Sequence, residues 1–205
     1  GGLFLVSADQ APLRSNRSLG SAEGVLMLEA PVGSYIVGTE AWSPSQRRAG
    51  RYREGVEFRP VPEDIAALSD LLMLRSTADP PTLLEAAIPL ALLRTDVRRG
   101  QTFAIGWEVS GLGFRPETLS FEVTVNRVDR GLFRRIGEFL RVSDGPQRVS
   151  LAWQEPGPEQ PSPLFRYLDL NLDSLAPGVY EVEVTLRTAG RSEVASVRRF
   201  RVRDG

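Results

Sequence analysis

The sequence predicts an all-β protein built from tandem antiparallel β-sandwiches. Three observations predict this class: runs in which apolar and polar residues alternate, turn-forming stretches such as SGLGFRPE, SDGPQ and TAGRSE between them, and no helices at the spacing of a βαβ unit. We expect a small or partial sandwich in residues 1–61 and a complete one in residues 62–205, with a helical insertion near residues 130–141. A single merged domain is the alternative that the pattern leaves open.

Five runs with a period of two define the expected strands of the second domain. In each run, alternate apolar residues face the core and the residues between them face water. In the last run of the chain, Val197 and Phe200 fall on opposite parities, so we expect a bulge near residues 198–199. The inward-facing sets are Phe103, Ile105, Trp107 and Val109; Phe121, Val123 and Val125; Val149, Leu151 and Trp153; Leu168, Leu170 and Leu172; and Tyr180, Val182, Val184 and Leu186.

Two segments break the strand pattern. Residues 82–93 (TLLEAAIPLALL) predict a short helix that Pro89 interrupts. Residues 129–141 (DRGLFRRIGEFLR) predict an amphipathic helix inserted between two strands. Its apolar residues at helical spacing are Leu132, Phe133, Ile136, Phe139 and Leu140.

One short arrangement occurs twice. LAPGVYEVEV (residues 175–184) and APVGSYIVGT (residues 30–39) each place a glycine two positions before a tyrosine that opens an extended run. The copy at Tyr180 resembles the tyrosine corner of immunoglobulin-like and fibronectin type III-like sandwiches, in which the tyrosine hydroxyl bonds back to the upstream backbone. The resemblance covers roughly residues 69–202. It implies that EVASVRRFRV is strand G and that Trp107 matches the core tryptophan of strand C.

The resemblance identifies a superfold rather than a function. An antibody-type domain is not expected, because the chain has no cysteine pair. The first copy has only about 60 residues, against about 100 for a full sandwich. Either its missing strands lie upstream in a parent protein or its sheet is completed by something else. The opening GGLFLVSADQ, which lacks an initiator methionine, favours a processed product or a piece of a longer protein.

The composition excludes most kinds of catalysis. All 25 basic residues are arginines, and the chain has neither histidine nor cysteine. Ser–His triads, thiol nucleophiles, zinc–thiolate sites and Schiff bases are therefore excluded. Carboxylate pairs are the remaining candidates for catalysis, but outward-facing carboxylates usually solvate a sheet. We expect no enzyme activity, no cofactor and no metal. The carboxylates concerned are Glu108, Glu117, Glu122, Asp169, Glu181 and Glu183.

Two stretches are candidates for binding a partner. The amphipathic segment 129–141 suits an acidic protein surface or lipid headgroups, and the alternative is a helix that caps its own sandwich. The second candidate comprises Trp42 and the stretch SQRRAGRYRE, which places Arg47, Arg48, Arg51 and Arg53 around Tyr52, and its predicted docking residues are Trp42, Arg47 and Arg48. A solvated hairpin turn and a surface for single-stranded nucleic acid are the alternatives for this stretch. Because the net charge is only −1, we expect no nucleic-acid partner. The candidates within the amphipathic segment are Arg130, Phe133, Arg134, Arg135, Phe139 and Arg141.

Together these features predict a non-enzymatic, membrane-extrinsic structural or interaction subunit of a bacterial envelope complex. Its expected location is periplasmic or extracellular, and it would be held at the membrane by other protein subunits. One such role is that of a periplasmic scaffold of a photosynthetic reaction centre and its antenna. One alternative is a non-catalytic C-terminal module of a secreted or membrane-anchored enzyme. Another is a carbohydrate-binding module, for which Trp42, Trp153 and Tyr167 are the aromatic candidates. The inward parity of Trp153 favours core packing for it, so Trp42 is the expected exposed platform.

Overall fold

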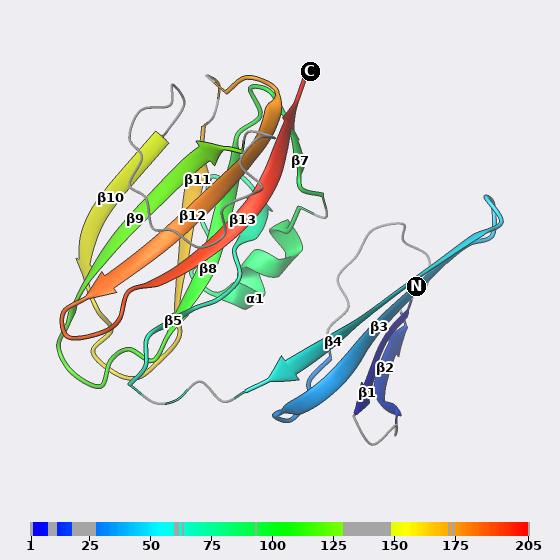
Figure 1. The fold of residues 1–205 in the computed structure, drawn as a ribbon, viewed down its shortest axis with the longest axis horizontal. Coiled ribbons are helices and arrows are strands. Elements are labelled where there is room, and N and C mark those ends of the chain that lie inside the picture. Colours follow the sequence, from blue (N-terminus) through cyan, green and yellow to red (C-terminus); the bar gives the residue numbers. More distant parts are fainter. Residues whose placement is uncertain are drawn as a thin grey trace. The chain divides into compact units, whose positions relative to one another are not determined.

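The chain is all-β, as its sequence predicts (Figure 1). The computed structural model describes residues 2–7, 12–17, 28–59, 62, 64–92, 94–128, 149–171, 173 and 175–204. The chain divides into two compact units, Gly1–Pro60 and Val61–Gly205, next to the boundary expected after residue 61. Each unit is described by itself.

Unit 1 is a four-stranded antiparallel sheet. Its strands are β1 (Gly2–Ser7), β2 (Pro12–Arg17), β3 (Gly33–Ser43) and β4 (Arg48–Phe58), in the order β2-β1-β3-β4. The described residues of this unit form a single layer. The small or partial sandwich expected for unit 1 therefore stays a prediction.

Unit 2 has two sheets. The larger has the order β10-β9-β12-β13-β7, and its one parallel pair among the described strands joins β13 to β7. The smaller has the order β11-β8-β5, with β6 also paired to β8. The strands are β5 (Ala67–Leu68), β6 (Leu72–Arg75), β7 (Asp96–Arg98), β8 (Phe103–Ser110), β9 (Thr118–Arg127), β10 (Val149–Pro156), β11 (Leu164–Leu170), β12 (Gly178–Thr188) and β13 (Val194–Arg203).

The two sheets of unit 2 bury one core between them. Phe103 of β8 contacts Phe200 of β13 edge-on, with 5.3 Å between ring centroids. Trp107 of β8 lies 6.0 Å from Phe121 of β9. These two aromatic pairs therefore connect the smaller sheet to the larger one. The alternating apolar residues of β8, β9 and β12 face inward, as predicted.

A tyrosine hydrogen bond lies at the start of β3 in unit 1 and of β12 in unit 2. The Tyr180 hydroxyl donates to the Ala176 carbonyl oxygen at 2.8 Å, and its ring is fully buried. The Tyr35 hydroxyl donates in the same way to the Pro31 carbonyl oxygen, also at 2.8 Å. The hydrogen bond predicted for this corner is therefore confirmed in both copies, four residues upstream of each tyrosine.

The segment interrupted by Pro89 is helical, as predicted. It forms α1 (Leu84–Ala87), followed by a 3-10 turn (Ile88–Leu90), and it covers the outer face of β8. A Cβ at Gly106 would lie 2.7 Å from the Phe165 ring and 2.8 Å from Leu74 Cδ1, so only glycine fits there. β8 is thus covered on both faces, whereas the sequence predicted a face open to water.

Three expectations about the strands of unit 2 are wrong. The β12–β13 register runs without a bulge through residues 198–199, and Val197 simply points outward with 51% of its surface exposed. Val149 and Leu151 have the predicted inward parity but are exposed, because they lie on the edge strand β10. Trp107 lies in the sheet opposite Tyr180, whereas strands C and F of immunoglobulin-like domains share a sheet.

Removing the buried hydroxyl of Tyr180 tests the corner. We expect Tyr180→Phe to lower the free energy of unfolding by about 1 kcal/mol, because the Ala176 carbonyl loses its partner. Tyr52→Phe is the control, since that hydroxyl bonds to Glu54 at the surface and its loss should be nearly neutral. Equal effects in urea unfolding would contradict the assignment.

Candidate functional site

The predicted docking residues fall into two groups. Six of them (Arg130, Phe133, Arg134, Arg135, Phe139 and Arg141) lie outside the described residues, as does the helix predicted for them. The other three, Trp42, Arg47 and Arg48, lie together at the end of the β3–β4 hairpin. The candidate site that the structure describes is therefore this hairpin end.

The hairpin extends past the other described strands of its sheet (Figure 1). β1 pairs with β3 only from Tyr35 to Glu40, while β3 and β4 continue to pair up to Ser43 and Arg48. We call residues 41–50 the hairpin arm. Its turn is closed by a hydrogen bond from the Arg47 amide to the Pro44 carbonyl oxygen at 3.3 Å. Arg47 has a φ of 50°, in the left-handed region that non-glycine residues rarely occupy.

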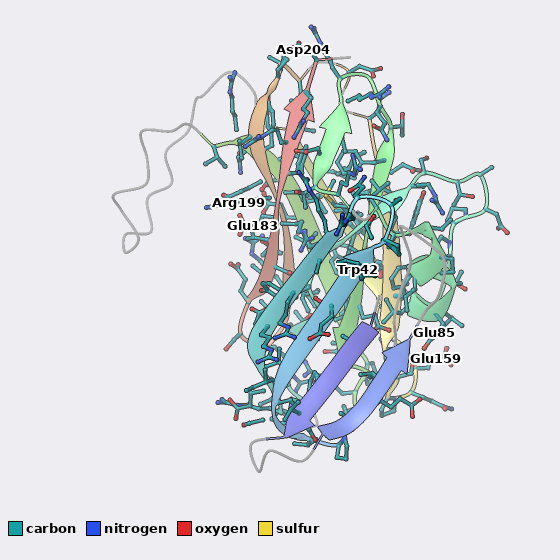
Figure 2. All side chains as sticks on the ribbon, turned by 90° about the vertical axis from the view of Figure 1, so that its right-hand side faces the viewer. Trp42, Glu85, Glu159, Glu183, Arg199 and Asp204 are labelled. Atoms are coloured by element: carbon teal, nitrogen blue, oxygen red, sulfur yellow. The ribbon has the colours of Figure 1, made fainter. Side chains whose placement is uncertain are left out.

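Trp42 is the main apolar side chain of the arm. Its side chain belongs to the end of β3, labelled in Figure 2, and 60% of its surface is exposed. Its cross-strand partner is Ala49, which leaves the indole uncovered from that side. Tyr52 is similarly exposed but belongs to the opposite face, because it pairs with Thr39. A hydrogen bond to Glu54 raises the pKa of Tyr52, so its hydroxyl stays protonated at neutral pH.

The hairpin carries an excess of positive charge. Residues 40–54 hold four arginines against two glutamates. Arg51 pairs with Glu40 across the strands, with Nε 2.7 Å from Oε1. Arg47, Arg48 and Arg53 make no ion pair within the described parts of the chain. By strand register Arg53 lies opposite Gly38, on the same face as Trp42. The sequence pattern included Arg53 in the arginine-rich stretch but not among the predicted docking residues, although pairing of the two strands places it on the face of Trp42.

The carboxylates predicted to face outward make structural contacts. Glu122 pairs with Arg187, Glu181 pairs with Arg199, and Asp169 accepts hydrogen bonds from Ser76 and Tyr167. Glu183, which is half-buried, and Arg199, which is exposed, lie on the outer face of the larger sheet (Figure 2). Within the part of the chain that the structure describes, no group of three or more carboxylates is placed to hold a metal ion.

Glu117 is the exception, because it is buried rather than outward. Its carboxylate accepts two hydrogen bonds from the Arg191 guanidinium, Nε to Oε2 at 2.8 Å and Nη2 to Oε1 at 3.1 Å. The Glu117 side chain is 3% exposed and the Arg191 side chain 5%. Asp64 adds a third contact, with Oδ1 2.7 Å from Arg191 Nη2. No local pattern could have predicted this pair, since 74 positions of sequence separate the two residues. The ion pair ties the segment at Asp64 to the loops before β9 and after β12.

The three aromatics predicted to bind sugar do not share a face. Trp153 stacks on Phe121 with ring centroids 5.1 Å apart, and its indole donates to Glu155. Tyr167 lies on the outer face of the smaller sheet, packed against the cluster around α1. Burial raises the pKa of Tyr167. Its hydroxyl accepts a hydrogen bond from the Thr77 amide and donates one to the Asp169 carboxylate. Trp42 belongs to the other unit.

Comparison with known proteins identifies no family for this chain. No protein-family model matches it, and no curated protein matches its sequence. Among the described residues, no helix has the length and apolar character needed to cross a membrane. Function is therefore inferred from the residues that the molecule exposes on its surface.

The buried ion pair predicts a large effect from one arginine. Arg191→Ala leaves the buried Glu117 carboxylate without its counter-ion and with the Gly113 amide as its remaining hydrogen-bond donor among the described residues, so we expect a loss of about 3–5 kcal/mol in the free energy of unfolding. Arg187→Ala is the matched control, because Arg187 also contacts two glutamates but is half exposed, and exposed pairs contribute under about 1 kcal/mol. Urea titrations that give equal losses would contradict the burial of this pair.

Glu108 predicts a pH-dependent effect. Burial raises the pKa of Glu108, and repulsion from Glu85 raises it further, so its ionised form destabilises the folded state at neutral pH. We expect Glu108→Gln to raise the melting temperature at pH 7. The gain should vanish below about pH 4, where the wild-type carboxyl is protonated in both folded and unfolded states. Glu85→Gln removes only the second cause and should give a smaller gain; a lower melting temperature for Glu108→Gln at pH 7 would contradict this account.

Proposed function

We propose that this protein is a non-enzymatic interaction subunit of a larger bacterial envelope assembly, docking to another protein through its hairpin arm. The observation that carries the proposal is the arm itself, which presents Trp42 and free arginines on two strands that extend past the rest of their sheet. Tryptophan and arginine are the residues most enriched among those that dominate binding energy at protein interfaces. A periplasmic or extracellular location, at a membrane, belongs to the same proposal.

The charge of the arm supports an acidic partner surface. Arg47 and Arg48 of the arm, and Arg53 next to it on β4, are not neutralised by described carboxylates, and all three are exposed. Complementary charge at the rim of an interface speeds association and selects the partner, while a buried aromatic side chain supplies affinity. Trp42 would then enter an apolar pocket while the arginines meet carboxylates around it.

The residue types in the chain support a non-enzymatic role. The chain lacks histidine, cysteine and lysine. Glu117, Glu122 and Glu181 are each held by an arginine, which lowers their availability as general acids or bases. These contacts are those of structural carboxylates that solvate or fasten a sheet.

Carbohydrate binding is the second candidate, favoured only by the exposure of Trp42. An aromatic platform alone provides stacking but no polar groups that fix the orientation of a sugar. If this candidate holds, Trp42→Ala should abolish retention of the full chain on a polysaccharide column. Unchanged retention, or none for the wild type, removes it.

The docking proposal is tested by purifying the tagged full chain from its source in mild detergent and quantifying the protein that accompanies it. We expect Trp42→Ala to weaken the association about 30-fold, the effect of losing about 2 kcal/mol at a binding hot spot. We expect Arg48→Glu to weaken it more at low salt than at high salt.

The matched control for charge is Arg94→Glu, which makes the same charge change at an exposed position of unit 2 and should leave the association intact. Recovery of the wild-type chain as a lone monomer would contradict the proposal. So would a partner that is retained equally by Trp42→Ala and the wild type.

A further inference from the structure

The sheet of unit 1 repeats part of unit 2. In each unit, the strand that follows the tyrosine corner pairs with the last strand on one side and with the first strand of an earlier antiparallel pair on the other. The order β2-β1-β3-β4 thus corresponds to β10-β9-β12-β13. Unit 1 therefore has a counterpart of the larger sheet of unit 2.

The two sheets also match in register when Tyr35 is placed on Tyr180. From each tyrosine, every second residue of its strand (β3 or β12) pairs with every second residue of the strand beside it (β1 or β9). On this alignment Val37 corresponds to Val182 and Thr39 to Val184. The unit 1 pairs are Tyr35–Ser7, Val37–Leu5 and Thr39–Leu3, and the unit 2 pairs are Tyr180–Arg127, Val182–Val125 and Val184–Val123.

The matching faces differ in what covers them. In unit 2 the Tyr180 face is the inner face of the sandwich, packed against β8, and Val182 and Val184 are fully buried. We call the corresponding surface of unit 1 the Tyr35 face. By strand register its apolar and neutral members include Leu3, Leu5, Tyr35, Val37, Thr39, Tyr52, Val56 and Phe58, and its charged members are Glu54 and, at the end of the hairpin, Arg48. On this face Tyr35 is buried and Val37 and Val56 are half-buried, but Thr39 and Tyr52 are exposed, and Phe58 is 43% exposed whereas its counterpart Val202 is 3% exposed.

We propose that the Tyr35 face is one half of a β-sandwich, and that an antiparallel sheet of the partner subunit forms the other half. The occupant is inferred from unit 2, where the equivalent face is an established interface with a sheet of alternating large apolar residues. β8 presents Phe103, Ile105, Trp107 and Val109 to it. A partner strand with the same alternation would reproduce that packing, at the spacing of about 10 Å usual for stacked sheets.

This inference rests on the proposed function, because it takes the second sheet from the docking partner. It adds a second contact to the hairpin arm, on a different surface. Trp42 and Ile36 belong to the opposite face of β3 from Tyr35, since successive residues of a strand alternate. A partner sheet that covers the Tyr35 face does not contact Ile36, and Ile36 is also about 20 Å along the strand from the contact proposed at Trp42, so the difference between the two faces can be measured.

Site-specific photo-crosslinking in the full chain tests the inference. The photoreactive residue p-benzoylphenylalanine replaces Thr39 on the Tyr35 face or Ile36 on the opposite face, and both positions are exposed. After irradiation in the source organism, mass spectrometry identifies the linked peptides. We expect Thr39→p-benzoylphenylalanine to link to a partner peptide in which apolar residues alternate with polar ones, at least ten times more often than Ile36→p-benzoylphenylalanine does.

Each other outcome overturns the inference. Links from position 39 to residues 8–11 or 18–27 of the same chain would show that the unit covers its own face, and links to a second copy would show self-association. Equal yields at both positions would show no specific cover. If position 39 finds no partner but Trp42→Ala still weakens co-purification, the inference fails while the proposed function stands; if neither occurs, both fail.

Discussion

The hydrogen bond from the Tyr180 hydroxyl to the Ala176 carbonyl is the contact on which the account of this molecule depends. It fixes the start of β12, so the following alternate residues face β8 and bury the core of unit 2. The same bond at Tyr35 fixes β3 in unit 1, and the ring of each tyrosine packs on a phenylalanine of the next strand. Because a sheet with one apolar face is stable only when that face is covered, each tyrosine also marks the face that needs a cover.

The two units meet this requirement differently. Unit 2 supplies both of its layers, and α1 even covers the outer face of β8. The described residues of unit 1 supply one layer, and its hairpin arm leaves Trp42 exposed. An exposed aromatic arm and a partly exposed inner face, on which Tyr52 and Phe58 remain open to solvent, are expected on the sheet of a protein made for contact. Isolated surface apolar residues are common, but grouped ones mark binding surfaces. Unit 2 would then act as the stable body that presents unit 1.

Sequence periodicity predicted which residues share a face but not what covers that face. It placed Val182 and Val184 correctly, and the glycine–tyrosine pattern predicted the corner bonds, because both signals are local. It misplaced Leu151, since being on an edge strand is a property of the assembled sheet. Glu117 was expected in water for a similar reason: its arginine is distant in sequence and comes close only after folding. The hairpin arm was predicted through its residue types, while its exposure follows from where β1 ends.

Amide hydrogen exchange on the isolated full chain tests most directly whether the Tyr35 face lacks a cover. The measurement compares β3 with β12, two strands of equal length that each pair on both sides and each follow a tyrosine corner. If the account is right, the amides of β3 between Tyr35 and Glu40 exchange at least a hundred times faster than those of β12, because an uncovered sheet opens locally. Equal protection in the two strands would show that unit 1 is already complete and would contradict the account.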